Sequence, residues 1–447
     1  MVNEPLVLVA AVAEAVLGEY THSIEFPADD EYMIVYGPNG VGKTKFLEIV
    51  HAVSSMDAQA LSRAPFERAT LRYSDGTTMS AAVIGAQSTN APSQSPIPRV
   101  QFRLTLPEQP EVVWENPVVD LEEWLIENTT WRPAGGRMWE DRIDGEVLHI
   151  GDLAVRFAGD MVSPEDMPAS FQHYKERVSS YLIETQRLKI QERAPYARNF
   201  PARRRGMEKS SSRISGQAKK MQELVSEAQT SHSRITQQLD RTFPNRVLGA
   251  ADSGVVDDAT VRARYNDQNE FRSRLGRVVS VALEEALSLP DRSLEPWELK
   301  LLGLYLADAD KKLEPFEGLL QKIELLESIV NARLLRKRLQ VTATEGLRIT
   351  HEDAGREIDL DSLSSGEQHE IILLFDLLFS VPPGSIVLVD EPEISLHVAW
   401  QLSFIPDVRK IAELTGFRFI VATHSPQIVN DSWSRAVRLG PDEAEFS

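Results

Sequence analysis

The segment from Gly37 to Thr44 constrains this chain more than any other, because it has the pattern G-x-x-x-x-G-K-[ST]. A strand-like apolar stretch, 32–36, precedes it, and a stretch of helical character, 45–53, follows it. Glycines let backbone N–H groups fold around a polyphosphate, and a loop at a helix N-terminus favours anions. The predicted nucleoside triphosphate site consists of Gly37, Pro38, Asn39, Gly40, Val41, Gly42, Lys43 and Thr44.

Two side chains of this loop have distinct expected roles. Lys43 supplies a positive charge for the β- and γ-phosphates, and the Thr44 hydroxyl supplies a ligand for Mg²⁺. The sequence therefore predicts ATP and Mg²⁺ as the small molecules that the chain binds.

The composition is that of a globular protein, with 42% hydrophobic and 26% charged residues among 447. There is no run of 18 apolar residues, so no transmembrane helix is expected. The apolar stretch 6–17 has no Lys or Arg before it, which argues against a secretory signal. Cysteine is absent, which excludes disulfides and thiolate metal sites. A cytoplasmic protein is the simplest expectation, with no membrane partner.

The net charge of −19 is unevenly distributed along the chain. Residues 187–220 contain 11 Lys and Arg against 2 Glu, including the triplet at 203–205. Such a stretch can bind a phosphate backbone or an acidic partner, and it can equally be a solvated helix face. DNA binding through 187–220 is therefore one hypothesis of two.

A second group of motifs lies between residues 360 and 430. An apolar strand, 386–389, ends in Asp390 and Glu391, and a second apolar strand, 417–422, is followed by His424. The carboxyl ends of parallel strands meet at the crevice where α/β sheets bind ligands. We expect Asp390 to help hold Mg²⁺ and Glu391 to polarise the attacking water. His424 is expected to contact the γ-phosphate or that water.

Together these motifs resemble the ATP-binding-cassette superfamily in its SMC/RecF/OLD-like branch. The matching segments are GPNGVGKT at 37–44, LSSGEQ at 363–368, IVLVDEPE at 386–393, SLH at 395–397 and ATHSP at 422–426. The resemblance implies an α/β P-loop ATPase head with an antiparallel β lobe and a helical insert similar to a short coiled coil. It also implies a composite site, in which Ser364, Ser365 and Gly366 of a second copy contact the γ-phosphate. Hydrolysis would then require a dimer or a ring of dimers.

The signature of this chain departs from the usual Leu-Ser-Gly-Gly-Gln of the family, because Ser365 replaces a glycine. The family also has a glutamine that reaches Mg²⁺ and responds to the nucleotide. Gln186 is the first candidate, since it follows the apolar stretch 180–183 and precedes the insert. Gln101 is the alternative, and either residue can also be an ordinary surface glutamine.

Three regions are expected along the chain. Residues 1–186 form the N-terminal part of the head, 187–340 the helical insert, and 341–447 the C-terminal part of the head. Within the first, 60–160 is expected to be an antiparallel lobe with a loop at 86–98. Within the second, helices are expected over 207–242, 257–287 and 309–339, with a break at 243–245 because Pro244 lies there.

Only 23 residues follow His424, so no Toprim nuclease domain of the kind found in OLD relatives is expected. We therefore expect any effector chemistry to belong to a separate subunit. This expectation rests on an analogy with the ATPase subunits of bacterial anti-phage systems of the PtuA and AriA types. Two other functions remain open. One is a RecF-like ATPase of DNA repair, and the other is an ATP-gated scaffold that does not hydrolyse ATP.

Overall fold

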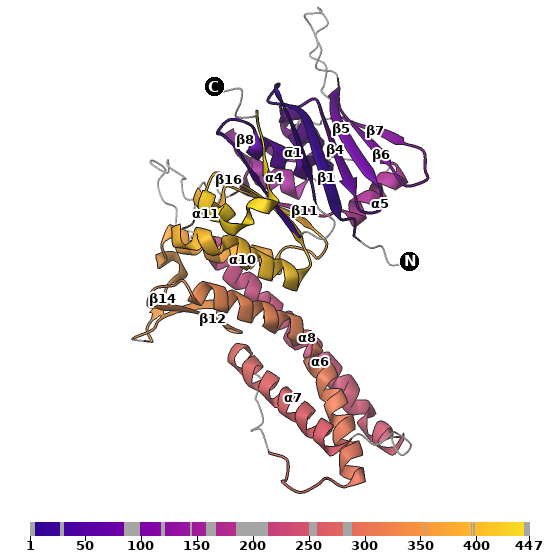
Figure 1. The fold of residues 1–447 in the computed structure, drawn as a ribbon, viewed down its shortest axis with the longest axis vertical. Coiled ribbons are helices and arrows are strands. Elements are labelled where there is room, and N and C mark those ends of the chain that lie inside the picture. The colour runs from indigo at the N-terminus through magenta and orange to yellow at the C-terminus, as the bar shows by residue number, and fades with distance from the viewer. Residues whose placement is uncertain are drawn as a thin grey trace, which may run out of the picture. The chain divides into compact units, whose positions relative to one another are not determined.

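The computed structural model describes residues 5–26, 31–84, 99–117, 121–143, 145–157, 167–184, 213–249, 257–279, 288–353, 355–394, 396 and 398–441. These residues form two compact units (Figure 1). Unit 1 combines 1–193 with 381–447, and unit 2 is the continuous segment 194–380.

Unit 1 contains a five-stranded parallel sheet in the order β11-β15-β16-β3-β17. The central strands β15 and β16 are apolar and buried over 386–389 and 419–422, as expected for a parallel sheet that is covered on both faces. The strands are β3 (Tyr32–Tyr36), β11 (Ser180–Glu184), β15 (Ile386–Asp390), β16 (Arg418–Thr423) and β17 (Ala436–Arg438).

A six-stranded antiparallel sheet, in the order β2-β1-β4-β5-β6-β7, lies beside it in the same unit. Helix α1 (Lys43–Ser55) packs against strands of both sheets, so its buried side chains join them into one hydrophobic core. The strands are β1 (Leu8–Val16), β2 (Tyr20–Glu25), β4 (Arg68–Tyr73), β5 (Thr78–Ile84), β6 (Arg99–Thr105) and β7 (Val112–Pro117).

Residues 121–157 were expected to belong to that lobe, but they form a separate small sheet with a core of its own. Trp131 and Trp139 are buried there, and such large aromatic rings suffice to nucleate a small core. The elements are α3 (Leu121–Asn128), β8 (Trp131–Gly135), β9 (Met138–Asp141), β10 (Val147–His149) and α4 (Ile150–Arg156).

Among the remaining helices of unit 1, α2 packs against α1 and β6, and α10 packs against α11. They are α2 (Ala58–Arg63), α5 (Ala169–Arg177), α10 (Val398–Thr415) and α11 (Pro426–Val429), with the short 3-10 helices η5 (Pro392–Ile394) and η6 (Asn430–Arg435).

Unit 2 is built on two long helices that run side by side, α6 (Arg213–Gly249) and α8 (Pro296–Asn331), with α7 (Asp258–Val278) packed on α8 (Figure 1). Most buried residues of α8 recur at three- and four-residue spacing, which is the apolar stripe of a helix that packs on one face.

The predicted break at 243–245 is wrong, because α6 continues through Pro244 to Gly249. Pro244 has no N–H to donate to the carbonyl oxygen of Asp240, so the helix loses one hydrogen bond there. Just after the proline, Arg246 donates to the carbonyl oxygen of Leu239 and to the carboxylate of Asp308 on α8. These contacts hold the turn after the proline in place.

The signature segment groups with the helical unit, and the expected boundary at 340 lies inside that unit. A small sheet follows α8 and leads through the 3-10 helix η4 (Leu360–Ser362) to α9 (Ser365–Phe379). Its strands are β12 (Lys337–Thr342), β13 (Gly346–His351) and β14 (Glu357–Ile358).

Helix α9 is tied to the base of both long helices. Asp376 accepts hydrogen bonds from Arg213 (3.2 Å) and Gln217 (2.7 Å) of α6. Near its other end, Glu370 forms a buried ion pair with Arg333, which follows α8. These contacts explain why 341–380 belongs to the helical unit.

Among the helices that the structure describes, none has the length and apolarity needed to cross a membrane.

Candidate nucleotide site

The phosphate loop connects β3 to α1 and uses glycine where the backbone requires it. Gly40 and Gly42 have φ angles of +86° and +89°, a region that other residues rarely adopt. A Cβ atom on Gly42 would also lie 2.9 Å from Cγ1 of Val16. No side chain caps the first N–H groups of α1, so they are available to an anion.

A buried histidine supports this loop from β2. The Nε2 atom of His22 lies 2.7 Å from the carbonyl oxygen of Val41, and only 1% of the residue is exposed. Burial lowers the pKa of His22, so the ring is neutral and donates its N–H to that carbonyl.

The Lys43 ammonium is folded back over the loop. It donates to the carbonyl oxygens of Gly37 (2.9 Å) and Pro38 (3.0 Å) and to Nδ1 of His424 (3.3 Å). Burial lowers its pKa, and the carboxylates of Glu391 and Asp390 act in the opposite direction. A phosphate group entering the loop would compete for this ammonium with uncharged acceptors only.

The Thr44 hydroxyl and the Asp390 carboxylate form one oxygen-rich group. Thr44 Oγ1 donates to Oδ2 (2.9 Å) and Oδ1 (3.1 Å) of Asp390, which is 5% exposed at the end of β15. Hydroxyl and carboxylate oxygens are the ligands that Mg²⁺ prefers. The donor set therefore fits a Mg²⁺ ion that is shared with bound phosphates.

Glu391 and His424 face each other across the ends of β15 and β16. Oε1 of Glu391 lies 3.5 Å from Nε2 of His424. Burial and the neighbouring Lys43 lower the pKa of His424, and Glu391 counteracts them. Because Lys43 donates to Nδ1, the neutral ring carries its proton on Nε2 and points it at Glu391.

The backbone at Glu391 is strained, with φ at +46°, which is uncommon for a residue with a side chain. Its N–H donates to the carbonyl oxygen of Ala422 on β16 at 2.8 Å. This turn directs the Glu391 carboxylate toward His424 instead of along the strand.

Lys43, Thr44, Glu391 and His424 border one cavity of about 360 Å³. Leu17, from the turn between β1 and β2, closes one side of it. The lining residues are Leu17, Asn39, Gly40, Gly42, Lys43, Thr44, Lys45, Glu391 and His424. The fold thus places in one pocket most of the phosphate-loop residues, Glu391 and His424 that the sequence singled out. Asp390 lies directly behind Thr44.

The signature residues lie in unit 2, at the start of α9. Ser364 is the N-cap, and its hydroxyl and backbone N–H both donate to Oε2 of Glu367 at 2.9 Å. Lys337 donates to both oxygens of the same carboxylate. Ser364 and Ser365 are exposed, and Gly366 follows them in the first turn of the helix.

Several predicted residues lie outside the described part of the chain, namely Gln186, Ser395, His397 and the basic segment 187–212. The alternative glutamine, Gln101, lies on β6, where it donates to Glu115 and accepts from Arg103. It does not line the cavity. At the described end of the basic stretch, Arg213 contacts Asp376, and Lys220 contacts Ser380.

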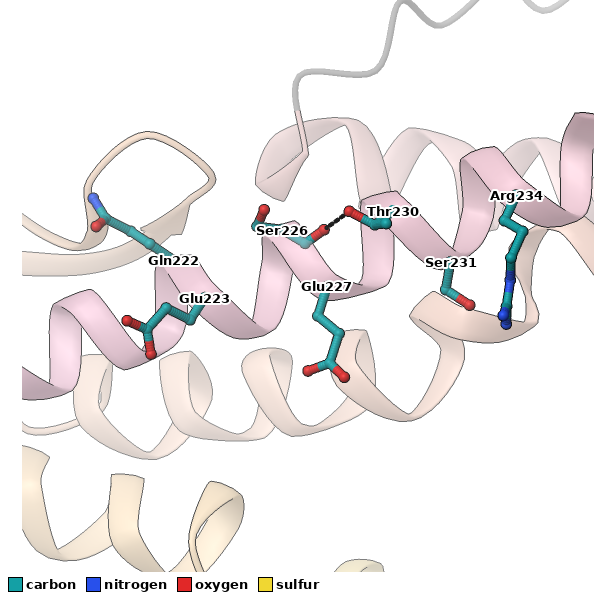
Figure 2. Close-up of a pocket in the computed structure, with 7 residues that line it drawn as sticks. All are labelled: Gln222, Glu223, Ser226, Glu227, Thr230, Ser231 and Arg234. Carbon is teal, nitrogen blue, oxygen red and sulfur yellow. Dashed lines mark hydrogen bonds between the residues drawn. The ribbon is translucent and has the colours of Figure 1, made fainter.

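A larger hollow of about 700 Å³ lies along α6 and has a different character. Figure 2 shows that its labelled side chains all project from this one helix, and that Thr230 bonds to the backbone of Ser226. Glu223 and Glu227 make it acidic, with Arg234 at one end. The residues that line this hollow include no glycine and all belong to one helix, so it does not match the phosphate site.

Sequence reasoning missed three residues around the site, His22, Glu393 and Gln401. The second glutamate of Asp-Glu-Pro-Glu was visible in the sequence, because it follows Asp390 and Glu391 in the same motif. His22 lies on a different strand from the motifs, and Gln401 lies on a helix without any motif of its own, so only the fold shows their contacts.

A parallel sheet whose strands end in a phosphate loop, an Asp-Glu pair and a histidine defines a P-loop ATPase of the expected α/β class. The chain belongs to the family described as "AAA domain, putative AbiEii toxin, Type IV TA system", whose model matches residues 173–430, more than half of the chain. The match includes the signature, Asp390, Glu391 and His424, whereas the phosphate loop precedes it. The prediction of an ATPase family with a link to defence systems is thereby confirmed.

Among characterised proteins, the chain is similar to the Retron Ec83 probable ATPase of Escherichia coli, with 34% identity over 95 residues. That alignment covers 19% of this chain and 17% of the relative.

Solved structures of SMC heads also align with it. The Pyrococcus furiosus Smc head domain bound to the C-terminal domain of ScpA has a TM-score of 0.34 at 12% identity, over 97% of this chain and 93% of that one. The Thermotoga maritima SMC head domain has a TM-score of 0.32 at 11% identity, over 98% and 99%.

Proposed function

We propose that this protein binds ATP with Mg²⁺ in the cavity at residues 37–44 and hydrolyses it. The observation that supports the proposal is the meeting of Lys43, Glu391 and His424 in one pocket, with the Thr44–Asp390 pair beside them. Phosphoryl transfer depends mainly on positioning and charge stabilisation, and these groups supply both.

Each residue has a role in the proposed reaction. Lys43 exchanges its carbonyl and histidine contacts for the β- and γ-phosphates. Thr44 and Asp390 hold Mg²⁺, with Gln186 as a further ligand, and the bound ion neutralises phosphate charge. Glu391 accepts a proton from the attacking water, and His424 orients that water or the γ-phosphate.

We further propose that the site is completed by a second copy of the chain, whose Ser364, Ser365 and Gly366 contact the γ-phosphate. Ser364 and Ser365 are exposed at a helix start, where backbone N–H groups favour an anion. Mass photometry of the Glu391→Gln variant tests this proposal. ATP should raise the mass from monomer to dimer, and a monomer at every ATP concentration would contradict the trans role.

The cellular role that we propose is control of a separate effector subunit, a nuclease in the first instance, after the ATPase senses DNA or a foreign component. The family name refers to a toxin and a type IV TA system, and the relative's name refers to a retron. Both names support a role in anti-phage defence. Purification of the chain with its genomic neighbours tests this, since a nuclease that copurifies and responds to ATP is expected.

The two alternatives make different predictions. A RecF-like repair ATPase should bind DNA without any effector subunit, and its ATP turnover should rise with DNA. An ATP-gated scaffold should bind ATP with no measurable turnover, and Glu391→Gln should then change nothing.

A further inference from the structure

Glu393 contacts His424 through the backbone N–H of the histidine and not through its imidazole ring. It lies in η5, two residues after Glu391, and its Oε1 accepts the backbone N–H of His424 at 2.6 Å. A hydrogen bond to a carboxylate is roughly twice as strong as one between neutral groups.

This bond lies where the sheet no longer holds the chain. The ladder between β15 and β16 ends at Asp390 and Ala422, and the ladder between β16 and β3 ends one residue later, at Thr423 and Tyr36. His424 is the next residue. The Glu393 carboxylate therefore holds the first residue beyond the last ladder pair.

The second carboxylate oxygen of Glu393 is unfavourable for the stability of the fold. Oε2 is fully enclosed, and it has no hydrogen-bond partner among the described residues. An enclosed, unpaired carboxylate oxygen destabilises a fold, so a neutral side chain would be better for stability alone. A role of Glu393 in the nucleotide site therefore explains its carboxylate more simply than a role in stabilising the fold.

A second side chain ties the same two segments together. Gln401 on α10 is 7% exposed, and its amide donates to the carbonyl oxygens of Leu396 (3.2 Å) and Glu393 (3.4 Å). Its Oε1 accepts the hydroxyl of Ser425 at 2.7 Å. The segment after Glu391 is thus tied to the histidine segment at two points, the backbone N–H of His424 and the side chain of Ser425.

We infer that Glu393 and Gln401 are positioning residues for the proposed reaction: they fix the backbone of His424 so that Nε2 faces Glu391 and Nδ1 faces Lys43. Neither residue lines the cavity, so neither contacts the nucleotide directly. The inference rests on the proposed ATP hydrolysis, because it assigns these residues to the same site.

The test compares Glu393→Ala, Glu393→Gln and Gln401→Met with the exposed control Glu413→Gln on the same helix as Gln401. Misplacing a catalytic group by about 1 Å costs on the order of 100-fold in rate. Glu393→Ala should therefore lower kcat roughly 10- to 100-fold and leave the KM for ATP within about 2-fold. Glu393→Gln should recover part of the loss, because its amide oxygen can accept the same N–H, and Gln401→Met should lower kcat in the same direction.

A kcat within about 2-fold of wild type in both Glu393 variants would overturn the inference, as would parallel changes in kcat and KM. Circular dichroism checks folding. If Glu393→Ala is misfolded, the decision passes to Glu393→Gln and Gln401→Met.

Amide hydrogen exchange at His424 separates this inference from the proposed function, because it needs no turnover. Exchange should be faster in Glu393→Ala than in wild type and unchanged in Glu413→Gln. If the wild-type protein does not hydrolyse ATP, the proposed function fails, and the exchange measurement still shows whether Glu393 holds the histidine. Unchanged exchange in Glu393→Ala would contradict the tie itself.

Discussion

Gly346, the first residue of β13, is the position where one methyl group should damage unit 2 most clearly. Its φ of +71° is in the left-handed region, which costs a residue with a Cβ about 1–2 kcal/mol. An added Cβ would also lie 1.9 Å from the carbonyl oxygen of Ala218. That atom belongs to the backbone of α6 and cannot rotate away, so overpacking adds about 1–3 kcal/mol. Gly346→Ala should therefore lower the free energy of unfolding by about 2–5 kcal/mol.

Gly355→Ala is the matched control, since this glycine lies in the next turn of the same sheet. Its φ is +59°, and an added Cβ would meet nothing within 4 Å. The control should thus lose only the left-handed term, about 1–2 kcal/mol. Urea unfolding followed by circular dichroism measures both variants. Equal losses in the two would refute the reasoning, because they would mean that the hairpin does not press against α6.

Three further predictions concern the site. Lys43→Met should weaken ATP binding roughly 10- to 100-fold by calorimetry, because charge-assisted hydrogen bonds are lost, and unchanged affinity would exclude Lys43 as a phosphate ligand. Asp390→Asn should raise the Mg²⁺ concentration needed for half-maximal turnover, and an unaltered Mg²⁺ titration would contradict its assigned role. His22 has a pKa lowered from 6.5, so the unfolded chain binds a proton first and stability falls as pH drops below about 6.5. His22→Gln should reduce that slope by up to about 1.4 kcal/mol per pH unit in urea unfolding at pH 5–7, and parallel profiles would show that His22 does not contribute.

Much of the parallel sheet could be predicted from the sequence. The stretches 32–36, 386–389 and 419–422 consist of apolar residues with no polar alternation, which is the pattern of strands buried on both faces. The phosphate loop, Glu391 and His424 each follow one of these strands. Because the carboxyl ends of parallel strands lie at the same edge of a sheet, the sequence alone predicted that these residues lie close together.

Other features depended on contacts that no local pattern contains. Pro244 was assigned to a break, yet α6 continues through it, and the next turn is held by a contact from Arg246 to Asp308 on another helix. The separate core around Trp131 and Trp139 was merged with the β lobe, since short strands give no signal of which sheet they join. In the same way, Glu393 and Gln401 acquire their importance only from the position of His424.

The central claim is that Glu391 activates water for ATP hydrolysis in this pocket. The most direct measurement is single-turnover hydrolysis of ATP by wild type and Glu391→Gln, with ATP binding measured on the same samples. The variant should bind ATP as wild type does and hydrolyse it about 100- to 10,000-fold more slowly, the usual contribution of a general base. Turnover at the wild-type rate in Glu391→Gln would contradict the account.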